Sequence, residues 1–567
     1  MPAAHTLADR RSFLTYFAGL GLGGTLFPGV LWARVASGSE VNDATIVAAA
    51  EVAGLTFSDD ERKQMLSGLK AQPQTLATLR AVPLENSVAP ALVFDPMPPM
   101  TEPPKGASRP PMRSKPATRP VPANLEDLCY EPVTVLSELV RTRKVTSTAL
   151  TRMYLARLRR LDERLKCVVT FTEDRALRQA ADADAEMARG KYRGALHGIP
   201  WGAKDLFAVK GYPTTWGSAP FKDQQFNEDA TIVQRLDAAG AVLIAKLTLG
   251  ELAMGDVWFG GRTNNPWKLD SGSSGSSAGP GSATAAGCVG FAIGTETLGS
   301  ISSPSSTNGV TGLRPTFGRV PRTGAMALVW SMDKIGPMAR SVEDAALVFN
   351  VLHGPDGRDR SCRAAPFSWD AAAPLAKIRV GFVKSAFDST ERHPLKTFDD
   401  AALDVLRKLG APLVPVELPD APYNAMRLIL EAEAGAAFDE LTRSGRVREM
   451  AQQGPNAWPS TFRRAHLIPA VDYINANRVR ALAIEKWADL FRNVDVIVTP
   501  TGAANQLIAT NLTGHPACIL PNGLRDGTPS NISITFLGSL FGEANLLRMA
   551  HAYQQATGFH LSHPALA

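Results

Sequence analysis

The chain has 567 residues, of which 45% are hydrophobic and 20% charged, with a formal net charge of +6. This composition is typical of a large globular protein, and because the positive charge is spread thinly we expect no nucleic-acid partner. The five cysteines are scattered and form no CxxC pair, so neither a disulfide framework nor a metal site is predicted.

The N-terminal segment has the pattern of an export signal. Residues 10–14, RRSFL, match the twin-arginine motif, and a glycine-rich apolar stretch follows them. This stretch is only moderately apolar and is interrupted by Pro28, which favours a signal over a spanning helix. We expect residues 1–36 to be a twin-arginine signal, with transient membrane contact during export, and the mature protein to be periplasmic. There are two alternatives. The segment could be a membrane anchor, or it could be a buried helix of a cytoplasmic protein.

Two smaller segments follow before the main domain. Residues 44–93 carry apolar positions at helical spacing and predict a small helical module, with Ser58 and Glu61 forming a capping box at its second helix. Residues 94–124 are rich in proline, so they cannot form a packed core. We expect this linker to be an extended spacer or a strap across a surface, and the main domain to span residues 125–567.

The main domain has the pattern of an α/β protein. Residues 132–189 have helical periodicity with a stop near Gly190, and short apolar runs alternate with helical segments after that point. This alternation predicts a large mixed, mostly parallel twisted sheet covered by helices on both sides.

A serine- and glycine-rich stretch, residues 269–287, interrupts this pattern. By composition it resembles a flexible linker. Gly275–Gly279 also fits G-x-S-x-G, the nucleophile elbow of α/β-hydrolases, which must directly follow a buried strand. The preceding residues are polar and include a proline, so the context disfavours that interpretation. The histidines available to such a triad, none in a distinctive motif, are His515, His551, His560 and His563.

Two predicted strand ends lie on either side of this stretch. Residues 199–203 predict a short strand with Lys204 at its polar end, and the apolar run 288–293 leads into a glycine-containing turn that ends at Ser300. Successive backbone N–H groups in such a turn can converge on one point, the geometry that an oxyanion hole needs. One lysine and two serine-bearing segments could therefore meet.

Three long segments in this order, residues 198–218, 275–301 and 309–356, resemble the amidase signature family. The resemblance covers roughly residues 125–558 and includes the C-terminal piece 512–523. It implies the amidase signature fold and an amide-cleaving enzyme without a cofactor. The serine-rich stretch is then a shaped backbone, not a linker.

The resemblance implies a Ser-Ser-Lys triad of Lys204, Ser276 and Ser300. The family places its bridging serine 24 residues before the nucleophile, which selects Ser276 from the two Gly-Ser-Ser copies, and its peptide bond is expected to be cis. Ser300 would attack the amide carbonyl to form an acyl-enzyme, with Ser276 passing its proton to a neutral Lys204. The resemblance further implies an oxyanion hole at Thr297, Leu298 and Gly299, together with the Ser300 N–H, and supporting hydroxyls on Ser277 and Thr295.

Two positions depart from the family pattern. Leu298 replaces a glycine, which narrows the expected site, and Ser302 replaces an arginine, which weakens the case for a charged-substrate pocket. An apolar substrate pocket is predicted from Met326, Leu328 and Trp330, although each could equally be ordinary core. The expected substrate is a small-molecule amide, with esters and carbamates open as alternatives.

Two other functions stay open. One is the catalytic subunit of a tRNA-dependent amidotransferase. The helical module favours it, because it is loosely similar to the small helical partner of such subunits, whereas the export signal and Ser302 oppose it. The other is a non-catalytic binding protein on the same scaffold, which the intact lysine and serines oppose. A homodimer is left open.

Overall fold

The computed structural model describes residues 41–52, 55–64, 66, 68–70, 85–88, 92–117, 119–389 and 394–566. The chain forms two compact units, one of residues 1–85 with 467–471 and one of residues 86–466 with 472–567. The expected twin-arginine segment, residues 1–36, lies outside the described residues. Among the residues described, no helix is both long and apolar enough to cross a bilayer.

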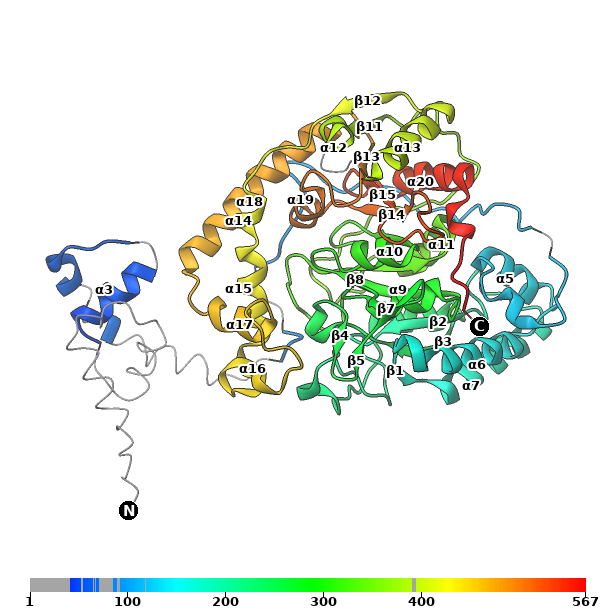
Figure 1. Ribbon diagram of the computed structural model, residues 1–567, viewed down its shortest axis with the longest axis horizontal. Helices are drawn as coiled ribbons and strands as arrows, with labels where there is room; N and C mark the ends of the chain where they lie inside the picture. The colour runs from blue at the N-terminus through cyan, green and yellow to red at the C-terminus, as the bar shows by residue number, and fades with distance from the viewer. Residues whose placement is uncertain are drawn as a thin grey trace, which may run out of the picture. The chain divides into compact units, whose positions relative to one another are not determined.

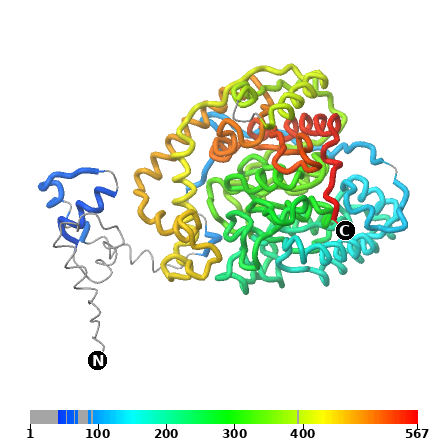
Figure 2. The backbone as a smooth tube through the Cα atoms, viewed as in Figure 1, coloured from blue at the N-terminus to red at the C-terminus, as the bar shows by residue number. Residues whose placement is uncertain are grey.

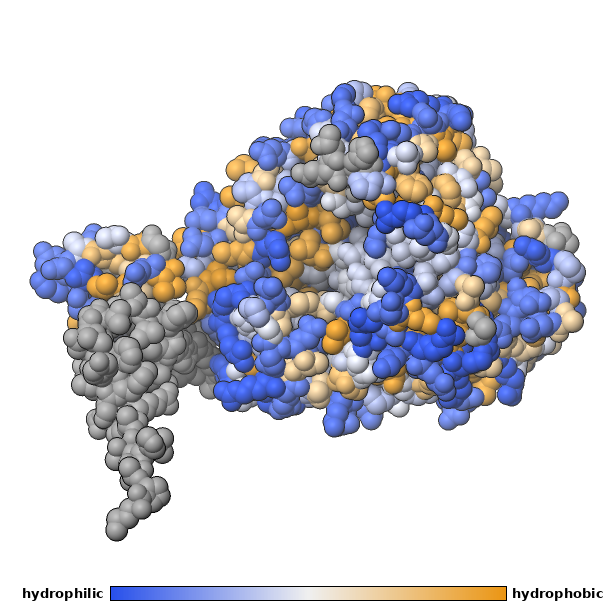
Figure 3. Space-filling view, in the orientation of Figure 1, coloured by the Kyte–Doolittle hydropathy of each residue, from blue (hydrophilic) through white to orange (hydrophobic). Residues whose placement is uncertain are grey.

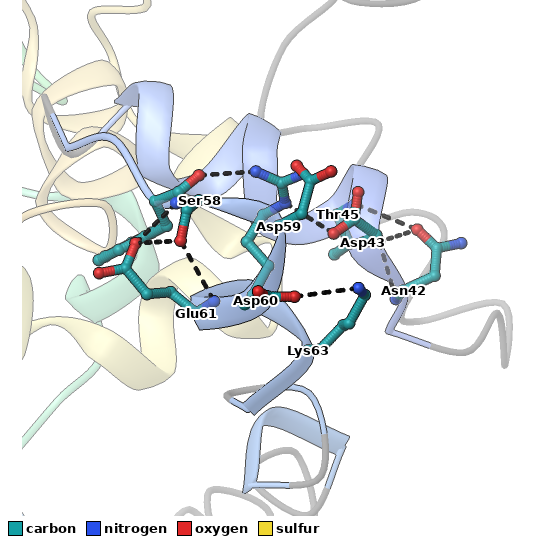
Figure 4. A network of polar contacts seen from close by, with 10 residues as sticks. Asn42, Asp43, Thr45, Ser58, Asp59, Asp60, Glu61 and Lys63 are labelled. Carbon is teal, nitrogen blue, oxygen red and sulfur yellow. Dashed lines mark hydrogen bonds and ion pairs between the residues drawn. The ribbon is translucent and has the colours of Figure 1, made fainter.

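The first unit contains the predicted capping box. Helix α3 spans Asp43–Val52, and residues 59–64 are also helical. The Ser58 N–H donates to the Glu61 carboxylate at 2.6 Å, and the Glu61 N–H donates back to the Ser58 hydroxyl at 3.4 Å (Figure 4). These reciprocal bonds satisfy N–H groups that the first helical turn leaves unpaired, so the helix begins here.

The second unit is built on one large sheet (Figure 1). Its strands are β1 Val168–Phe171, β2 Pro200–Lys204, β3 Val242–Leu247, β8 Phe291–Glu296, β9 Thr311–Arg314, β10 Lys334–Ala339, β11 Val380–Val383, β12 Leu413–Val416, β13 Val496–Pro500, β14 Ala517–Pro521 and β15 Ser533–Gly538. Two small ribbons pair β4 Val257–Trp258 with β5 Gly261–Arg262, and β6 Asn264–Asn265 with β7 Lys268–Gly272.

Helices flank this sheet, as the tube drawing in Figure 2 also shows. The α-helices are α5 Val133–Arg141, α6 Ser147–Leu165, α7 Glu173–Ala188, α8 Thr231–Ala238, α9 Ala278–Ala285, α10 Ser302–Asn308, α11 Val342–Leu352, α12 Lys384–Asp388, α13 Lys396–Lys408, α14 Tyr423–Met426, α15 Leu428–Ala437, α16 Asp439–Arg443, α17 Trp458–Ala465, α18 Ala470–Phe491, α19 Gln506–Thr513 and α20 Glu543–Thr557. Short 3₁₀ turns are η2 Leu125–Leu128, η3 Ala219–Phe221, η4 Glu251–Ala253, η6 Arg446–Glu449 and η7 Phe559–Leu561.

The sheet is mixed, as expected, but the expectation that it is mostly parallel needs correction. In the order β1-β3-β2-β8-β10-β9-β14-β15-β13-β11-β12, six neighbouring pairs are antiparallel and four are parallel. Parallel pairs need a crossover connection, usually a helix. The central strands β9 and β10, and likewise β14 and β15, are joined by loops, so these neighbours run antiparallel.

Strands β2 and β8 are parallel neighbours, and this pairing positions the candidate site. Trp201 pairs with Phe291 and Ala203 pairs with Ile293, so the carboxyl ends of both strands lie at the same edge. Helix α9 packs against β2, β3, β8 and β10, and its residues are buried throughout. Residues 276–287 of the serine-rich stretch are therefore packed core over two strand ends, whereas residues 269–272 lie in the partly exposed β7.

The proline-rich segment lies as a strap on the second unit. Met112 pairs with the backbone of residues 369–371, and the Ser114 N–H donates to the Glu343 carboxylate at 2.7 Å. Because prolines cannot donate backbone hydrogen bonds, this segment is held by the few residues between them.

Candidate active site

Lys204 is the last residue of β2 and is fully buried. Its amine nitrogen lies 2.8 Å from the Ser276 hydroxyl, 3.1 Å from the Ser277 hydroxyl and 2.8 Å from the Thr295 hydroxyl. The structure thus brings together the lysine, the bridging serine and both supporting hydroxyls that the sequence predicted.

Burial lowers the pKa of Lys204 well below that of an ordinary lysine, and the charges of Asp333 and Glu296 only partly oppose this effect. The neighbouring buried lysine on β3 behaves differently: Lys246 forms a 2.7 Å ion pair with Asp205. Lys204 forms no ion pair within the described residues. A buried amine without a carboxylate partner is driven to its neutral form.

The hydroxyl of Ser277 orients this amine. It donates to the Thr295 carbonyl oxygen at 3.1 Å, so toward Lys204 it can act only as an acceptor. One amine N–H therefore points to Ser277, and a second can bond Thr295 Oγ1. In the neutral amine the lone pair then faces Ser276, where it can accept a proton.

Small residues allow this close packing. The Gly275–Ser276 peptide bond is cis, as the family resemblance implies. A Cβ on Gly275 would come within 1.8 Å of the Gly255 carbonyl oxygen, and one on Gly294 within 2.7 Å of Ser277 Oγ. A larger side chain at Gly275 would push the serine-rich stretch away from the loop at Gly255, and one at Gly294 would separate the stretch from β8.

Ser300 lies in the turn between β8 and α10. It is 7% exposed, and its carbonyl oxygen accepts from the Ser277 N–H at 3.1 Å, which ties the turn to the serine-rich stretch. Gly299 has φ of 96°, a conformation that glycine adopts readily. Within the described residues, the N–H groups of residues 297–300 donate to no other backbone group, so they are available to an incoming oxyanion.

A carboxylate that the sequence analysis missed, Glu296, organises this turn. Glu296 accepts from the N–H groups of Ile301 and Ser302, at 2.9 and 2.7 Å, and from the Ser302 hydroxyl at 2.8 Å. Burial alone would raise the pKa of Glu296, but Arg314, Lys334 and the Ser302 N–H bring it to about 2. Its acidic side chain, three residues after the apolar run 288–293, is the signal that a buried partner exists.

A second missed carboxylate, Asp333, ties the turn to the predicted pocket. It accepts from the Thr297 hydroxyl at 2.5 Å with one oxygen, and from the N–H groups of Leu328 and Val329, at 2.8 and 2.9 Å, with the other. Its position just before β10, the neighbour of β8, is the feature that could have revealed it.

The predicted pocket residues do not share one environment. Met326 and Leu328 are buried in the core, whereas Trp330 is half-buried and its indole N–H finds no acceptor in the described part of the chain. On the face in Figure 3, hydrophobic residues gather between α15 and a paler central area over β8 and α10. Trp330 is therefore the member of the set best placed to meet a ligand.

The α/β-hydrolase alternative fails on geometry. The strand before its motif is β7, which is partly exposed and belongs to a two-stranded ribbon. The Ser277 hydroxyl at the centre of the motif is committed to Lys204 and Thr295, and His515 bonds Thr513.

A family model described as Amidase matches residues 149–519. The chain belongs to the amidase family. Among amidase-family relatives, a glutamyl-tRNA(Gln) amidotransferase subunit from Methylococcus capsulatus is 35% identical over 475 residues, covering 75% of this chain and 96% of that protein.

Solved amidase-family structures share the fold. The native peptide amidase from Stenotrophomonas maltophilia aligns with a TM-score of 0.68 at 30% identity, covering 76% of this chain and 98% of that one. A peptide amidase in complex with the competitive inhibitor chymostatin gives 0.69 at 31% identity, covering 78% and 100%. These neighbours confirm the expected amidase signature fold.

Proposed function

We propose that this protein cleaves the C–N bond of carboxamides, with Ser300 as nucleophile, Ser276 as proton bridge and Lys204 as base. The observation that supports this most is the buried amine of Lys204, 2.8 Å from Ser276 and without an ion pair in the described part of the chain. Of the other buried lysines, Lys246 pairs with Asp205 and Lys334 donates to the Met332 carbonyl oxygen, whereas the amine of Lys204 is surrounded by the hydroxyls of Ser276, Ser277 and Thr295.

The reaction begins when Ser300 Oγ attacks the amide carbonyl carbon. The Ser300 proton moves to Ser276 as the Ser276 proton moves to the lone pair of Lys204. The reverse transfer protonates the leaving amine, which leaves an acyl-enzyme ester on Ser300. A water molecule, deprotonated through the same relay, attacks the ester and releases the acid.

The negative charge that develops on the carbonyl oxygen needs donors. The N–H groups of residues 297–300 are the proposed oxyanion hole, held in shape by Glu296 on one side and by Asp333 through Thr297 on the other. The leucine at 298 keeps its N–H, so this departure from the family pattern leaves the donor set unchanged.

A hydrolysis screen tests the proposal. Purified protein is incubated with C-terminal peptide amides, glutamine, aryl amides, esters and carbamates, and the released ammonia, amine or alcohol is measured. We expect release from at least one amide and none from the Ser300→Ala variant. A Ser300→Ala variant that hydrolyses as fast as the wild type would rule the assignment out.

The relatives favour a second candidate, the catalytic subunit of a tRNA-dependent amidotransferase, because the amidotransferase sequence from Methylococcus capsulatus is matched over 96% of its length. The chemistry at Ser300 is shared, and the two candidates differ in where the nitrogen goes. Adding glutamine as nitrogen donor, ATP to activate the glutamate carboxylate, glutamyl-tRNA(Gln) and candidate partner proteins separates them. Nitrogen transfer to the tRNA-bound glutamate supports the amidotransferase, whereas hydrolysis by the isolated chain alone supports a stand-alone amidase.

We also propose export through the twin-arginine route, on the RRSFL motif at residues 10–14. Cell fractionation tests it, with an Arg10→Lys/Arg11→Lys variant as control. Recovery of the unaltered chain in the cytoplasm alone would oppose export and strengthen the amidotransferase candidate.

A further inference from the structure

A loop at residues 326–333, named here the pocket loop, connects the predicted pocket to the turn that carries Ser300. Its last residue, Asp333, bonds both the N–H groups of Leu328 and Val329 and the hydroxyl of Thr297. A displacement of the pocket loop would therefore reach the proposed oxyanion hole through one side chain.

Asn86 holds one side of this loop. Its side-chain N–H donates to the Ala327 carbonyl oxygen at 2.9 Å, and its side-chain oxygen accepts from the Ala327 N–H at 2.7 Å. The two bonds satisfy both polar backbone groups of Ala327, as a neighbouring strand would. Asn86 lies 241 residues away in the sequence, so the contact is purely tertiary.

Phe94 acts on the other side of the loop through an arginine. The guanidinium of Arg480 lies over the Phe94 ring, 3.4 Å from its centre. The same guanidinium donates to the Ser331 hydroxyl at 2.9 Å and to the Ser331 carbonyl oxygen at 2.7 Å. Arg480 is 1% exposed, so its side chain has little room to move. The Phe94 ring stacked on the guanidinium therefore fixes the plane of that group.

Glu433 completes the hold on Ser331. It accepts from the Ser331 N–H at 2.9 Å and from the Ser331 hydroxyl at 2.6 Å. Two oppositely charged side chains, Glu433 of α15 and Arg480 of α18, thus both hydrogen-bond Ser331 of the pocket loop. The aromatic ring over the arginine comes from the proline-rich part of the chain.

The remaining strap contacts lie elsewhere. Residues 108–114 bond residues 367–371 and Glu343, and these bonds include no residue of the pocket loop. A segment that only covered apolar surface would not need a side-chain amide paired with both backbone groups of a loop residue, as Asn86 provides. The Asn86 bonds go to the loop itself. The Phe94 ring reaches the loop through Arg480, and it also packs against Phe317, with 5.0 Å between the ring centres.

We infer that Asn86 and Phe94 are positioning residues for amide cleavage: they hold the pocket loop, and through Asp333 the oxyanion turn, in the reactive geometry. This inference rests on the proposed function. The segment that precedes the catalytic fold is therefore part of the enzyme's working site.

Substitution of Asn86 in the full-length chain tests this inference, with Asn124→Ala as the matched control. Asn124 also precedes the catalytic fold, at the end of the strap, but it caps η2, accepting from the Glu126 N–H at 3.1 Å. We expect Asn86→Ala to lower kcat about 10-fold with a smaller change in KM, because oxyanion stabilisation acts in the transition state. Asn86→Asp keeps the bond from the Ala327 N–H but sets a carboxylate oxygen against the Ala327 carbonyl oxygen, so its kcat should fall at least as far as in Asn86→Ala. Asn124→Ala should leave kcat unchanged.

Hydrogen–deuterium exchange gives a readout that does not depend on activity. Amides in peptides covering residues 326–333 should exchange faster in Asn86→Ala than in the wild type or Asn124→Ala. Phe94→Leu, which keeps an apolar cover but removes the aromatic face, should also speed exchange there and lower kcat several-fold.

The outcomes separate the two proposals. An active wild type whose kcat is unaffected by Asn86→Ala and Phe94→Leu overturns the positioning role, whatever the exchange result. A wild type that cleaves no amide and does not react with a fluorophosphonate overturns the proposed function instead, and the positioning role with it.

Discussion

The hydroxyl of Ser277 donates to the carbonyl oxygen of Thr295 and accepts from the amine of Lys204, at 3.1 Å in both cases. This double use fixes the direction of the lysine lone pair without any carboxylate. Ser277 would therefore orient the proposed base, Lys204, without exchanging protons with it.

Removing that hydroxyl should impair the base. In Ser277→Ala one N–H of Lys204 loses its acceptor in a buried site, and the Thr295 carbonyl loses a donor, at a cost of about 1–3 kcal/mol. We expect kcat to fall about 10- to 100-fold. The control is Ser271→Ala in the same stretch, which should retain full activity, because within the described residues the Ser271 hydroxyl bonds only the side chain of Asp270.

The rate should depend on pH through Lys204. Burial lowers the pKa of this amine, and the neutral form is the active base, so kcat/KM should fall as pH decreases through the lowered pKa. The midpoint of this acidic limb should lie well below 10.5, the ordinary lysine value. A limb centred at that ordinary value would mean that Lys204 is not desolvated.

The buried ion pair between Glu296 and Arg314 should matter for stability. Arg314 donates to Glu296 at 2.8 Å with both side chains fully buried, so Arg314→Met leaves a buried carboxylate without its main partner. We expect the free energy of unfolding, measured in urea, to fall by about 3–5 kcal/mol. Adding Glu296→Gln to Arg314→Met should recover part of the loss. A loss below about 1 kcal/mol would show that Glu296 is compensated elsewhere.

Leu298 should restrict the acyl group of the substrate. It is half-buried beside Ser300, where the family pattern has glycine. Leu298→Gly should raise the relative kcat/KM for amides with bulky acyl groups about 10-fold, since one apolar contact in a pocket is worth that much. The comparison is a series of amides with straight and branched acyl chains. Equal effects across the series would place Leu298 outside the pocket.

The sequence predicted the site best where chemically reactive residue types stand at a fixed spacing within a long motif. Lys204 at the end of one strand and Ser276 at 24 residues before Ser300 could be predicted because each belongs to a long continuous motif. The structure brings Lys204 and Ser276 within hydrogen-bond distance. The Ser277 N–H also bonds the Ser300 carbonyl oxygen, which ties the Ser300 turn to these two residues. Within the described residues, the Ser300 hydroxyl makes no hydrogen bond.

The parts that were missed depend on long-range contacts. Asp333 and Asn86 act on Thr297 and Ala327, which lie 36 and 241 residues away, and no local pattern marks such pairs. Strand β8 begins at Phe291, not at Cys288 where the apolar run starts, because an apolar run reports burial and not backbone shape. The antiparallel centre of the sheet likewise depends on connections that periodicity does not reveal.

The central claim is that Ser300 is a nucleophile activated through Ser276 by Lys204. The most direct measurement is the rate of reaction with a fluorophosphonate, followed by mass spectrometry of the labelled peptide. The account predicts a single adduct on Ser300, with labelling slowed at least about 100-fold in Lys204→Ala. An adduct on a different residue, or equally fast labelling in folded Lys204→Ala, would contradict it.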